Sequence, residues 1–254
     1  MLKIQALHKV FNENTINENK VFTDFSLEVN EGDFISIIGS NGAGKSTLLN
    51  IISGNIQCDE GIIELNGEDV SYKDEYKRSK MIGRVFQNPS LGVAPNMTIL
   101  ENLSLADNKG KRFGLSSGVN KKRIPYYEEL LKELDLGLED KLYNKVNLLS
   151  GGQRQALSML IAVMSKPKLL LLDEHTAALD PHTSENLLAV TDKQIKENKL
   201  TALMITHHME DALKYGNRLL VLKDGQVKAD ISEEEKKNLK VSDLYSYFED
   251  WSKT

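Results

Sequence analysis

One stretch constrains this chain more than any other, a glycine-rich segment that ends in lysine and serine. It consists of Gly39, Ser40, Asn41, Gly42, Ala43, Gly44, Lys45, Ser46 and Thr47. The order Gly, four residues, Gly, Lys, Ser is typical of a phosphate-binding loop. Residues 34–38 before it predict a short buried strand, and residues 48–52 after it predict a helix. This arrangement directs backbone N–H groups and the helix dipole at one point, which suits a polyphosphate.

The loop also supplies the polar side chains that a nucleoside triphosphate needs. Lys45 would neutralise the β- and γ-phosphates, and the Ser46 hydroxyl would ligate Mg²⁺. The alternative is a glycine-rich turn that binds nothing. All positions of the pattern are filled and both flanks agree with it, so the sequence predicts that the chain binds a nucleoside triphosphate with Mg²⁺.

A second segment carries carboxylates at the end of an apolar run. Four leucines at 169–172 precede Asp173 and Glu174. Asp173 would hold Mg²⁺ through water, opposite Ser46, and Glu174 is a candidate general base for the attacking water. The alternative is a buried strand whose acidic end caps the next element. With a phosphate loop upstream, the pair instead predicts a P-loop nucleotidase.

Composition narrows the class of protein. The 254 residues are 40% hydrophobic and 27% charged, which is typical of a globular chain with one large domain and a subdomain. The net charge of −5 gives no overall attraction to nucleic acid. The single cysteine, Cys58, cannot form an internal disulfide, and its loop position predicts an inert thiol. The longest apolar stretches, at 159–164 and 169–172, fall far short of the roughly 18 residues that span a bilayer. We therefore expect a soluble chain that reaches any membrane through a partner.

The hydrophobic pattern predicts an α/β fold. Residues 2–10 and 21–29 alternate like the strands of an antiparallel hairpin. Strands and helices alternate in the second half, which predicts a mainly parallel sheet covered by helices. Between them, residues 88–166 have a helical pattern. Within it, Thr98 and Glu101 have capping-box spacing, and residues 127–136 predict a helix that ends at Gly137.

A third motif suggests that part of the site belongs to another subunit. Leu149, Ser150, Gly151, Gly152 and Gln153 precede a long apolar run, which predicts a second anion-binding helix start. The phosphate loop already serves this subunit's own nucleotide, so the second start suits a partner's phosphate. At this point the chain resembles the ATP-binding cassette (ABC) ATPases, whose signature motif these five residues match in full.

The resemblance covers essentially the whole chain, and it implies both a fold and a division of the chain into subdomains. It implies a P-loop ABC-ATPase domain over residues 1–230, with an antiparallel β subdomain at the N-terminus. In this division, residues 1–87 and 167–230 form the RecA-like core with the β subdomain. Residues 88–166 form a helical subdomain, and residues 231–254 form a helical tail. The tail could pack on its own core or on another subunit, and its apolar residues are Leu239, Val241, Leu244, Tyr245, Phe248 and Trp251.

The resemblance also assigns single residues. Gln87 matches the glutamine that touches Mg²⁺ and relays the state of the γ-phosphate, and Asp180, after Leu179, matches a loop that crosses the dimer interface. His207 matches the switch histidine that contacts the γ-phosphate, although His208 is adjacent. Phe11 matches the aromatic residue that stacks on adenine; the alternative is an ordinary core residue. His175 stands where the family often has proline, and it could perturb the site slightly; the alternative, which we expect, is an ordinary loop histidine.

What the resemblance implies is a head-to-tail homodimer that hydrolyses ATP. Each ATP would lie between residues 39–47 of one subunit and 150–153 of the other. Residues 87–102 and 207–212 resemble regions of importers, and the chain resembles a bacterial subgroup with some members linked to aromatic amino-acid uptake. This implies a membrane permease partner, a substrate-binding lipoprotein and a place at the cytoplasmic face of the membrane. The alternatives are an ABC exporter or lipoprotein-extraction complex and, from another class, a soluble ABC protein of translation or DNA repair.

A basic segment adds one hypothesis. It contains Lys109, Lys111, Arg112, Lys121, Lys122 and Arg123. These residues could face anionic lipid or the permease, where each charge would contribute about 1 kcal/mol. The alternative is an ordinary solvated loop.

Overall fold

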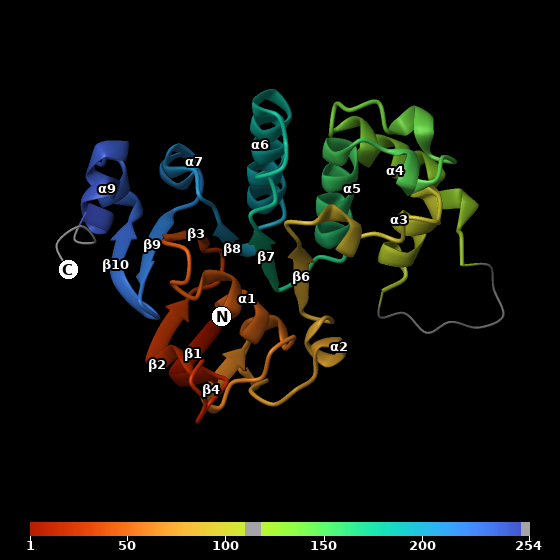
Figure 1. Ribbon diagram of the computed structural model, residues 1–254. Helices are drawn as coiled ribbons and strands as arrows, with labels where there is room; N and C mark the ends of the chain where they lie inside the picture. The colour runs from red at the N-terminus through yellow and green to blue at the C-terminus, as the bar shows by residue number, and fades with distance from the viewer. Residues whose placement is uncertain (110–117, 250–254) are drawn as a thin grey trace. The chain divides into compact units, whose positions relative to one another are not determined.

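The computed structural model describes residues 1–109 and 118–249 (Figure 1). The chain divides into two compact units. Unit 1 comprises Met1–Ser79 and the chain from Leu200 onward, and unit 2 comprises Lys80–Lys199. These units do not coincide with the predicted subdomains, whose boundaries stay a prediction. None of the helices in the described ranges is both long and apolar enough to cross a membrane.

Unit 1 contains an antiparallel sheet in the order β2-β1-β4-β5. Its strands are β1 (Leu2–Phe11), β2 (Asn19–Val29), β4 (Glu60–Leu65) and β5 (Glu68–Asp69). The pairing of Leu2 with both Val29 and Leu65 turns these three side chains to the same buried face. The predicted N-terminal hairpin is thereby confirmed.

A second group of strands in unit 1 includes β3 (Phe34–Gly39), the strand that leads into the phosphate loop. β3 lies between two parallel neighbours, β8 (Thr201–Ile205) and β9 (Arg218–Lys223), and β10 (Gln226–Ser232) pairs antiparallel with β9. All six residues of β3 are buried, as the apolar run predicts. The helices of unit 1 are α1 (Lys45–Ser53), α2 (Glu75–Arg78), α7 (Met209–Lys214), α8 (Glu233–Lys236) and α9 (Val241–Glu249).

Unit 2 contains the strand that ends in the two carboxylates. β7 (Leu169–Asp173) pairs in parallel with β6 (Ile82–Val85). The helices are α3 (Ile99–Asp107), α4 (Ile124–Lys132), α5 (Gly151–Met164) and α6 (Pro181–Glu197). Short 3-10 turns are η1 (Pro89–Leu91), η2 (Lys121–Arg123), η3 (Glu139–Lys141) and η4 (Val146–Leu148).

Local sequence signals set two helix boundaries in unit 2. At α3 the predicted capping box is confirmed, because the Thr98 hydroxyl accepts from the Glu101 N–H and the Glu101 carboxylate accepts from the Thr98 N–H. The predicted helix over 127–136 is wrong in its bounds. α4 starts at Ile124, since Pro125 fits a first helical turn, and it ends before Asp135, whose φ of +52° is left-handed.

The C-terminal tail packs on its own unit. Leu244 of α9 is fully buried in a cluster with Ile38, Ala212, Leu219, Val221 and Ile231. Of the two alternatives that the sequence left open, the tail up to residue 249 therefore packs on the core of its own chain. Trp251 lies outside the described residues.

Candidate active site

The phosphate loop of unit 1 is built around glycines that cannot carry a side chain. Gly39 ends β3, and a Cβ there would lie 2.5 Å from the Leu222 carbonyl oxygen. Gly44, the N-cap of α1, has a φ of +95°, and a Cβ on it would lie 2.8 Å from Cζ of Phe22. The strand and the helix can therefore be joined by this tight loop only with glycine at both positions.

Lys45 closes the loop from within. Its side chain is 6% exposed, and Nζ donates to the carbonyl oxygens of Gly39 at 2.7 Å and Ser40 at 2.8 Å. Ser46, next in α1, is exposed. Gly44 offers α1 no side-chain cap, and the first turn of α1 holds no acidic residue. The start of α1 thus combines helix N–H groups, a lysine and a hydroxyl, which fits a phosphate group.

His207 lies at the same edge of the unit 1 strands as the phosphate loop. β8 runs parallel to β3, with Ile205 opposite Ile37, and the Thr206 N–H donates to the Ile37 carbonyl at 3.2 Å. The next residue of the chain, His207, is exposed. Because the carboxyl ends of parallel strands meet at one edge, the sheet brings this histidine and the phosphate loop to the same side.

Phe11 is the last residue of β1 and is partly buried. The Lys9 ammonium lies 5.3 Å from the centroid of its ring. A partly exposed ring is available for stacking. Its stacking on adenine stays a prediction.

In unit 2, the predicted metal ligand Asp173 has a basic neighbour that the sequence analysis missed. Nη2 of Arg84, on β6, lies 3.3 Å from the Asp173 carboxylate, and both side chains are largely buried. The Arg84 guanidinium also lies 4.6 Å from the centroid of the Phe86 ring. The available signal was a charged residue within the apolar run 82–86, since a buried charge requires a partner.

The structure brings Gln87 and Glu174 together in unit 2. Nε2 of Gln87 donates to Oε2 of Glu174 at 3.1 Å. Glu174 has a φ of +46°, a left-handed conformation that is uncommon for residues other than glycine. Upstream, the Gln155 side chain of α5 donates to the Phe86 carbonyl at 3.0 Å and fixes the backbone that leads into Gln87. The candidate general base is therefore held in a specific, strained turn.

His175, in unit 2, differs from the expectation of an ordinary loop histidine, because its side chain is buried. It is 3% exposed, and burial lowers the pKa of its imidazole from 6.5 to about 4. Its Nε2 has no hydrogen-bond partner among the described residues. The ring is therefore a neutral packing group at neutral pH.

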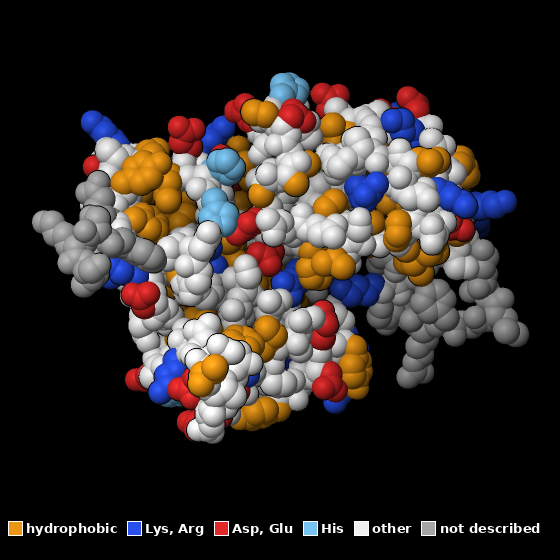
Figure 2. Space-filling model, viewed as in Figure 1, with side chains coloured by type: hydrophobic (Ala, Val, Ile, Leu, Met, Phe, Trp, Pro, Cys, Tyr) orange, Lys and Arg blue, Asp and Glu red, His pale blue; other side chains and the backbone are white. Residues whose placement is uncertain are grey.

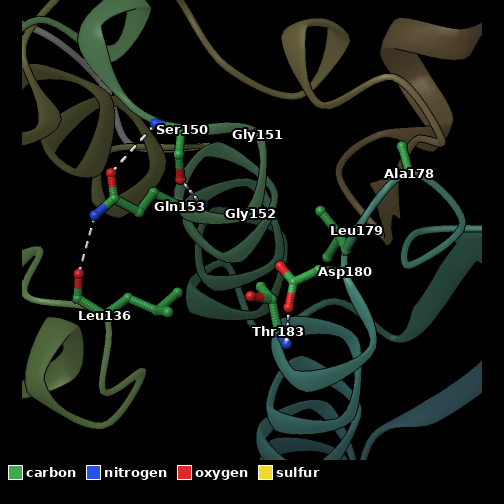
Figure 3. Close-up of a pocket in the computed structure, with 9 residues that line it drawn as sticks. All are labelled: Leu136, Ser150, Gly151, Gly152, Gln153, Ala178, Leu179, Asp180 and Thr183. Carbon is green, nitrogen blue, oxygen red and sulfur yellow. Dashed lines mark hydrogen bonds between the residues drawn. The ribbon is translucent and has the colours of Figure 1, made fainter.

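The signature residues line a cavity of about 350 Å³ in unit 2 (Figure 3). Ser150 and Gln153 form a reciprocal capping box at the start of α5, and Nε2 of Gln153 donates to the Leu136 carbonyl at 3.1 Å. The cavity is lined by Leu136, Ser150, Gly151, Gly152, Gln153, Ala178, Leu179, Asp180 and Thr183.

Asp180 and Thr183 form the α6 side of this cavity. Oδ1 of Asp180 accepts from the Thr183 N–H at 3.0 Å and caps α6, and the hydrogen bonds from Thr183 lower the pKa of the Asp180 carboxyl. A Cβ on Gly152 would lie 2.7 Å from Cγ2 of Thr183, so glycine lets α5 and α6 approach closely. The two motifs that the sequence separates by some 30 residues thus form one surface.

The candidate ligands suit Mg²⁺, an ion that usually keeps water and phosphate oxygens among its ligands, better than they suit a metal ion bound by protein groups alone. No group of three or more His, Cys, Asp or Glu residues that could hold a metal occurs within residues 1–109 and 118–249. Mg²⁺ is commonly held by one or two protein oxygens together with water and phosphate oxygens. Ser46 of unit 1 and, in unit 2, Gln87 and Asp173 each offer such an oxygen, and their role as ligands of Mg²⁺ stays a prediction.

The basic segment is only partly a free surface. Arg123 donates from Nε and Nη2 to the Asp107 carboxylate at 2.8 and 3.0 Å, and it lies 4.1 Å from the centroid of the Tyr126 ring. Lys121 and Lys122 are exposed, whereas Lys111 and Arg112 lie outside the described residues. The lipid or permease contact stays a prediction, and Lys121 and Lys122 are its best candidates.

Three comparisons agree on the family. Residues 22–177 match the family model described as ABC transporter. The chain is 48% identical over 249 residues to a tyrosine transport ATP-binding protein of Clostridioides difficile, covering 98% of this chain and 99% of that protein. It is 35% identical over 230 residues to a putative hemin import ATP-binding protein, HrtA, of Staphylococcus epidermidis, covering 89% and 98%.

Solved structures agree with these matches. The fold is similar to that of the ATP-binding cassette MJ0796 in a dimeric post-hydrolysis state bound to ADP and Pi, with a TM-score of 0.79 and 31% identity over 92% of this chain and 99% of that chain. It is also similar to the ADP conformation of MJ1267, an ATP-binding cassette of an ABC transporter, with a TM-score of 0.76 and 29% identity over 97% and 98%. The predicted P-loop ABC-ATPase fold is confirmed, and the chain belongs to the ABC transporter family as an ATP-binding-cassette ATPase.

Proposed function

We propose that this chain is the ATP-hydrolysing subunit of a bacterial importer of a small solute, with an amino acid such as tyrosine as the first candidate. The observation that carries the proposal is the 48% identity, over nearly the full length of both chains, to a tyrosine transport ATP-binding protein. Import also occurs in the names of relatives that are 32 to 35% identical, and these names mention hemin, spermidine/putrescine and phosphonates. The names therefore support import more strongly than they support one cargo.

In this proposal, two copies of the chain bind ATP head to tail. The phosphates lie on residues 39–47 of one copy and meet residues 150–153 of the other. The dimeric structures of MJ0796 support a dimer. The grouping of Ser150–Gln153 with Asp180 around one cavity supports a second, partner-facing half of the site. Half of each site then belongs to the partner, so ATP binding and dimer closure are linked.

The chain's own side chains then have distinct tasks. Lys45 and the start of α1 bind the phosphates, and Glu174 accepts a proton from the attacking water. Ser46, Asp173 and Gln87 would hold Mg²⁺, which would neutralise phosphate charge. His207 contacts the γ-phosphate, and Phe11 stacks on adenine. The Gln87–Glu174 hydrogen bond supports a link between the base and the segment that reports to the membrane partner.

The partner in the membrane would be a permease. Leu91 on η1 and Leu148 on η4 are large apolar side chains with 65% and 74% exposure. Arg154 holds their segments beside each other, since its guanidinium lies 3.4 Å both from the Ser90 hydroxyl and from the Asn147 carbonyl. This surface follows Gln87 directly and suits an apolar segment of a permease. The chain would thus sit at the cytoplasmic face of the membrane, with a lipoprotein delivering the solute to the permease.

Transport direction separates this function from its nearest rival, an exporter or lipoprotein-extraction ATPase. The membrane protein that co-purifies with the tagged chain is reconstituted in proteoliposomes with the chain and ATP on one side. If a binding lipoprotein co-purifies, it is placed on the opposite side. Radiolabelled tyrosine is supplied on that side in one preparation and on the side of the ATPase in another. An importer moves tyrosine toward the side that holds the ATPase, and Glu174→Gln abolishes this movement. Movement of tyrosine away from that side would overturn the import proposal. If tyrosine does not move but another solute is taken up, only the assignment of tyrosine as the solute is overturned.

A further inference from the structure

The segment between β8 and β9 contains His207 and one short helix, α7, and this helix packs against the tail of unit 1. α7 (Met209–Lys214) follows His207 and His208 immediately. A six-residue helix has little stability by itself, so its position depends on what it packs against. Whatever fixes α7 therefore also fixes the backbone that carries His207.

The far end of α7 is held by a buried lysine of the tail. The Tyr215 carbonyl, at the C-cap of α7, accepts from Nζ of Lys236 and from the Ser36 hydroxyl, the latter at 2.9 Å. Nζ of Lys236 also donates to the Gly216 carbonyl at 2.8 Å. The Lys236 side chain is 5% exposed. A cation that donates to the carbonyls at a helix C-terminus also complements the negative end of the helix dipole.

The same turn is fixed to the strand that leads into the phosphate loop. Gly216 has a φ of +78°, and a Cβ on it would lie 2.3 Å from the Phe34 carbonyl oxygen. The Asn217 N–H donates to that carbonyl at 2.9 Å, and the Asn217 side chain accepts from the Phe34 N–H at 2.7 Å. Lys236 therefore closes a junction between α7 and β3, the strand that ends at Gly39.

α9 holds α7 along its length. Met209 and Leu213 of α7 pack against the buried cluster to which α9 contributes Leu244. Tyr247 and Phe248 of α9 pack against the same cluster. Hydrophobic side chains gather on the surface of unit 1 around α9 (Figure 2). The tail thus contacts α7 in two ways: the Lys236 ammonium bonds to the C-terminal end of α7, and apolar side chains of α9 pack against the side of α7.

We propose that the tail, through Lys236, is a positioning element for His207. Lys236 is buried with its ammonium on the Tyr215 and Gly216 carbonyls, so it acts by fixing the helix that follows the histidine. This inference rests on the proposed contact of His207 with the γ-phosphate. It predicts that disturbing the tail slows hydrolysis while leaving nucleotide binding in place.

The first test compares two adjacent lysines of the tail. Lys236→Met keeps the length of the side chain and removes the charge. Lys237→Met is the matched control, because Lys237 is exposed and only lies 3.4 Å from the Glu233 carboxylate. We expect Lys236→Met to lower kcat for ATP by about tenfold with KM nearly unchanged, since a misplacement near 1 Å has effects of this order or more. Lys236→Arg restores part of kcat, and Lys237→Met behaves as the parent.

A double-mutant cycle with His207→Ala tests the route of the effect. If Lys236 acts through His207, Lys236→Met causes no further loss of kcat in the His207→Ala background. A second readout uses ¹⁵N-labelled histidine: the ring signal that His207→Ala removes shifts in Lys236→Met and not in Lys237→Met. This signal reports on the folded protein, so it separates repositioning from unfolding.

The outcomes separate the two levels of the proposal. A full, additive loss in the His207→Ala background, or an unmoved His207 signal, would overturn the positioning role and leave the ATPase assignment intact. Normal hydrolysis by His207→Ala would overturn the proposed role of His207 and, with it, this inference.

Discussion

The Gln87 side-chain amide donates a hydrogen bond to the Glu174 carboxylate, with 3.1 Å between Nε2 and Oε2. The first residue follows β6 and the second follows β7, two parallel strands whose carboxyl ends meet. The residue proposed to activate water is thus in direct contact with the residue proposed to report on the γ-phosphate. A change in the charge of the Glu174 carboxylate therefore changes the strength of its hydrogen bond with Gln87.

Replacing Glu174 by glutamine should trap the ATP-bound state. The amide keeps the shape of the side chain but cannot accept the proton of the attacking water, so ATP stays bound and the dimer stays closed. Size-exclusion chromatography with Mg-ATP checks this, with the exposed Glu129→Gln on α4 as a control that turns ATP over normally. A Glu174→Gln variant with normal turnover and no dimer would remove Glu174 from its proposed role.

Replacing Lys45 by alanine should weaken ATP binding. The triphosphate loses its closest cation, and the Gly39 and Ser40 carbonyls lose the donor that closes the loop. A charged hydrogen bond contributes about 1.5–3 kcal/mol, so the expected loss of affinity is on the order of 10- to 100-fold. Isothermal calorimetry measures it, with exposed Lys228→Ala on β10 as the control. Equal affinity in Lys45→Ala and the parent would contradict the assignment.

The elements that the sequence predicts well are those in which local pattern and final environment agree. The phosphate loop is one case, because glycine at 39 and 44 is required by the backbone and the flanking runs are apolar over their whole length. The capping box at Thr98 is another, since both partners lie within one turn of α3. Such features depend on neighbours in the chain and leave a readable pattern.

The features that the sequence does not predict depend on partners brought together by the fold. Arg84 meets Asp173 from 89 positions away, and Lys236 reaches the end of α7 from the tail. His175 has a polar side chain, and no local pattern indicates that the fold buries it. The sequence places the C-terminal end of α4 too late because Leu134 is buried although it lies beyond the helix, so the apolar spacing continues where the helix does not.

Replacing Gly152 by alanine should impair closure of the dimer and not the binding of ATP to the phosphate loop. The new Cβ would lie 2.7 Å from Cγ2 of Thr183, and a β-branched side chain in a helix has little freedom to move away. The cavity at the start of α5 would therefore be distorted. Size-exclusion chromatography of a Glu174→Gln background with Mg-ATP should show fewer dimers.

The companion substitution Thr183→Ser tests this cause. It removes the methyl group that clashes and keeps the backbone N–H that donates to Asp180. We expect the Gly152→Ala/Thr183→Ser pair to recover most of the dimer. A pair that dimerises no better than Gly152→Ala alone would exclude the clash as the cause of the defect.

His175 should make the chain less stable as the pH falls below about 6.5. Burial holds the pKa of this imidazole at about 4 in the folded chain, against an ordinary value of 6.5. Between these two values the unfolded chain binds a proton that the folded chain does not. Stability is therefore complete above pH 6.5 and falls as the pH drops toward 4, by at most about 1.4 kcal/mol for each pH unit.

Urea unfolding of the parent and of His175→Leu from pH 7 to pH 4.5 measures this contribution. We expect the free energy of unfolding to fall less steeply with decreasing pH in His175→Leu, because the leucine side chain binds no proton in either state. Thr176→Val is the control: Thr176 is 6% exposed and does not titrate over this range, so its replacement shifts stability by a constant amount. If His175→Leu and the parent lose stability in parallel from pH 6.5 downward, the imidazole is protonated without cost in the folded chain, and its burial in unit 2 does not govern the acid stability of the ATPase.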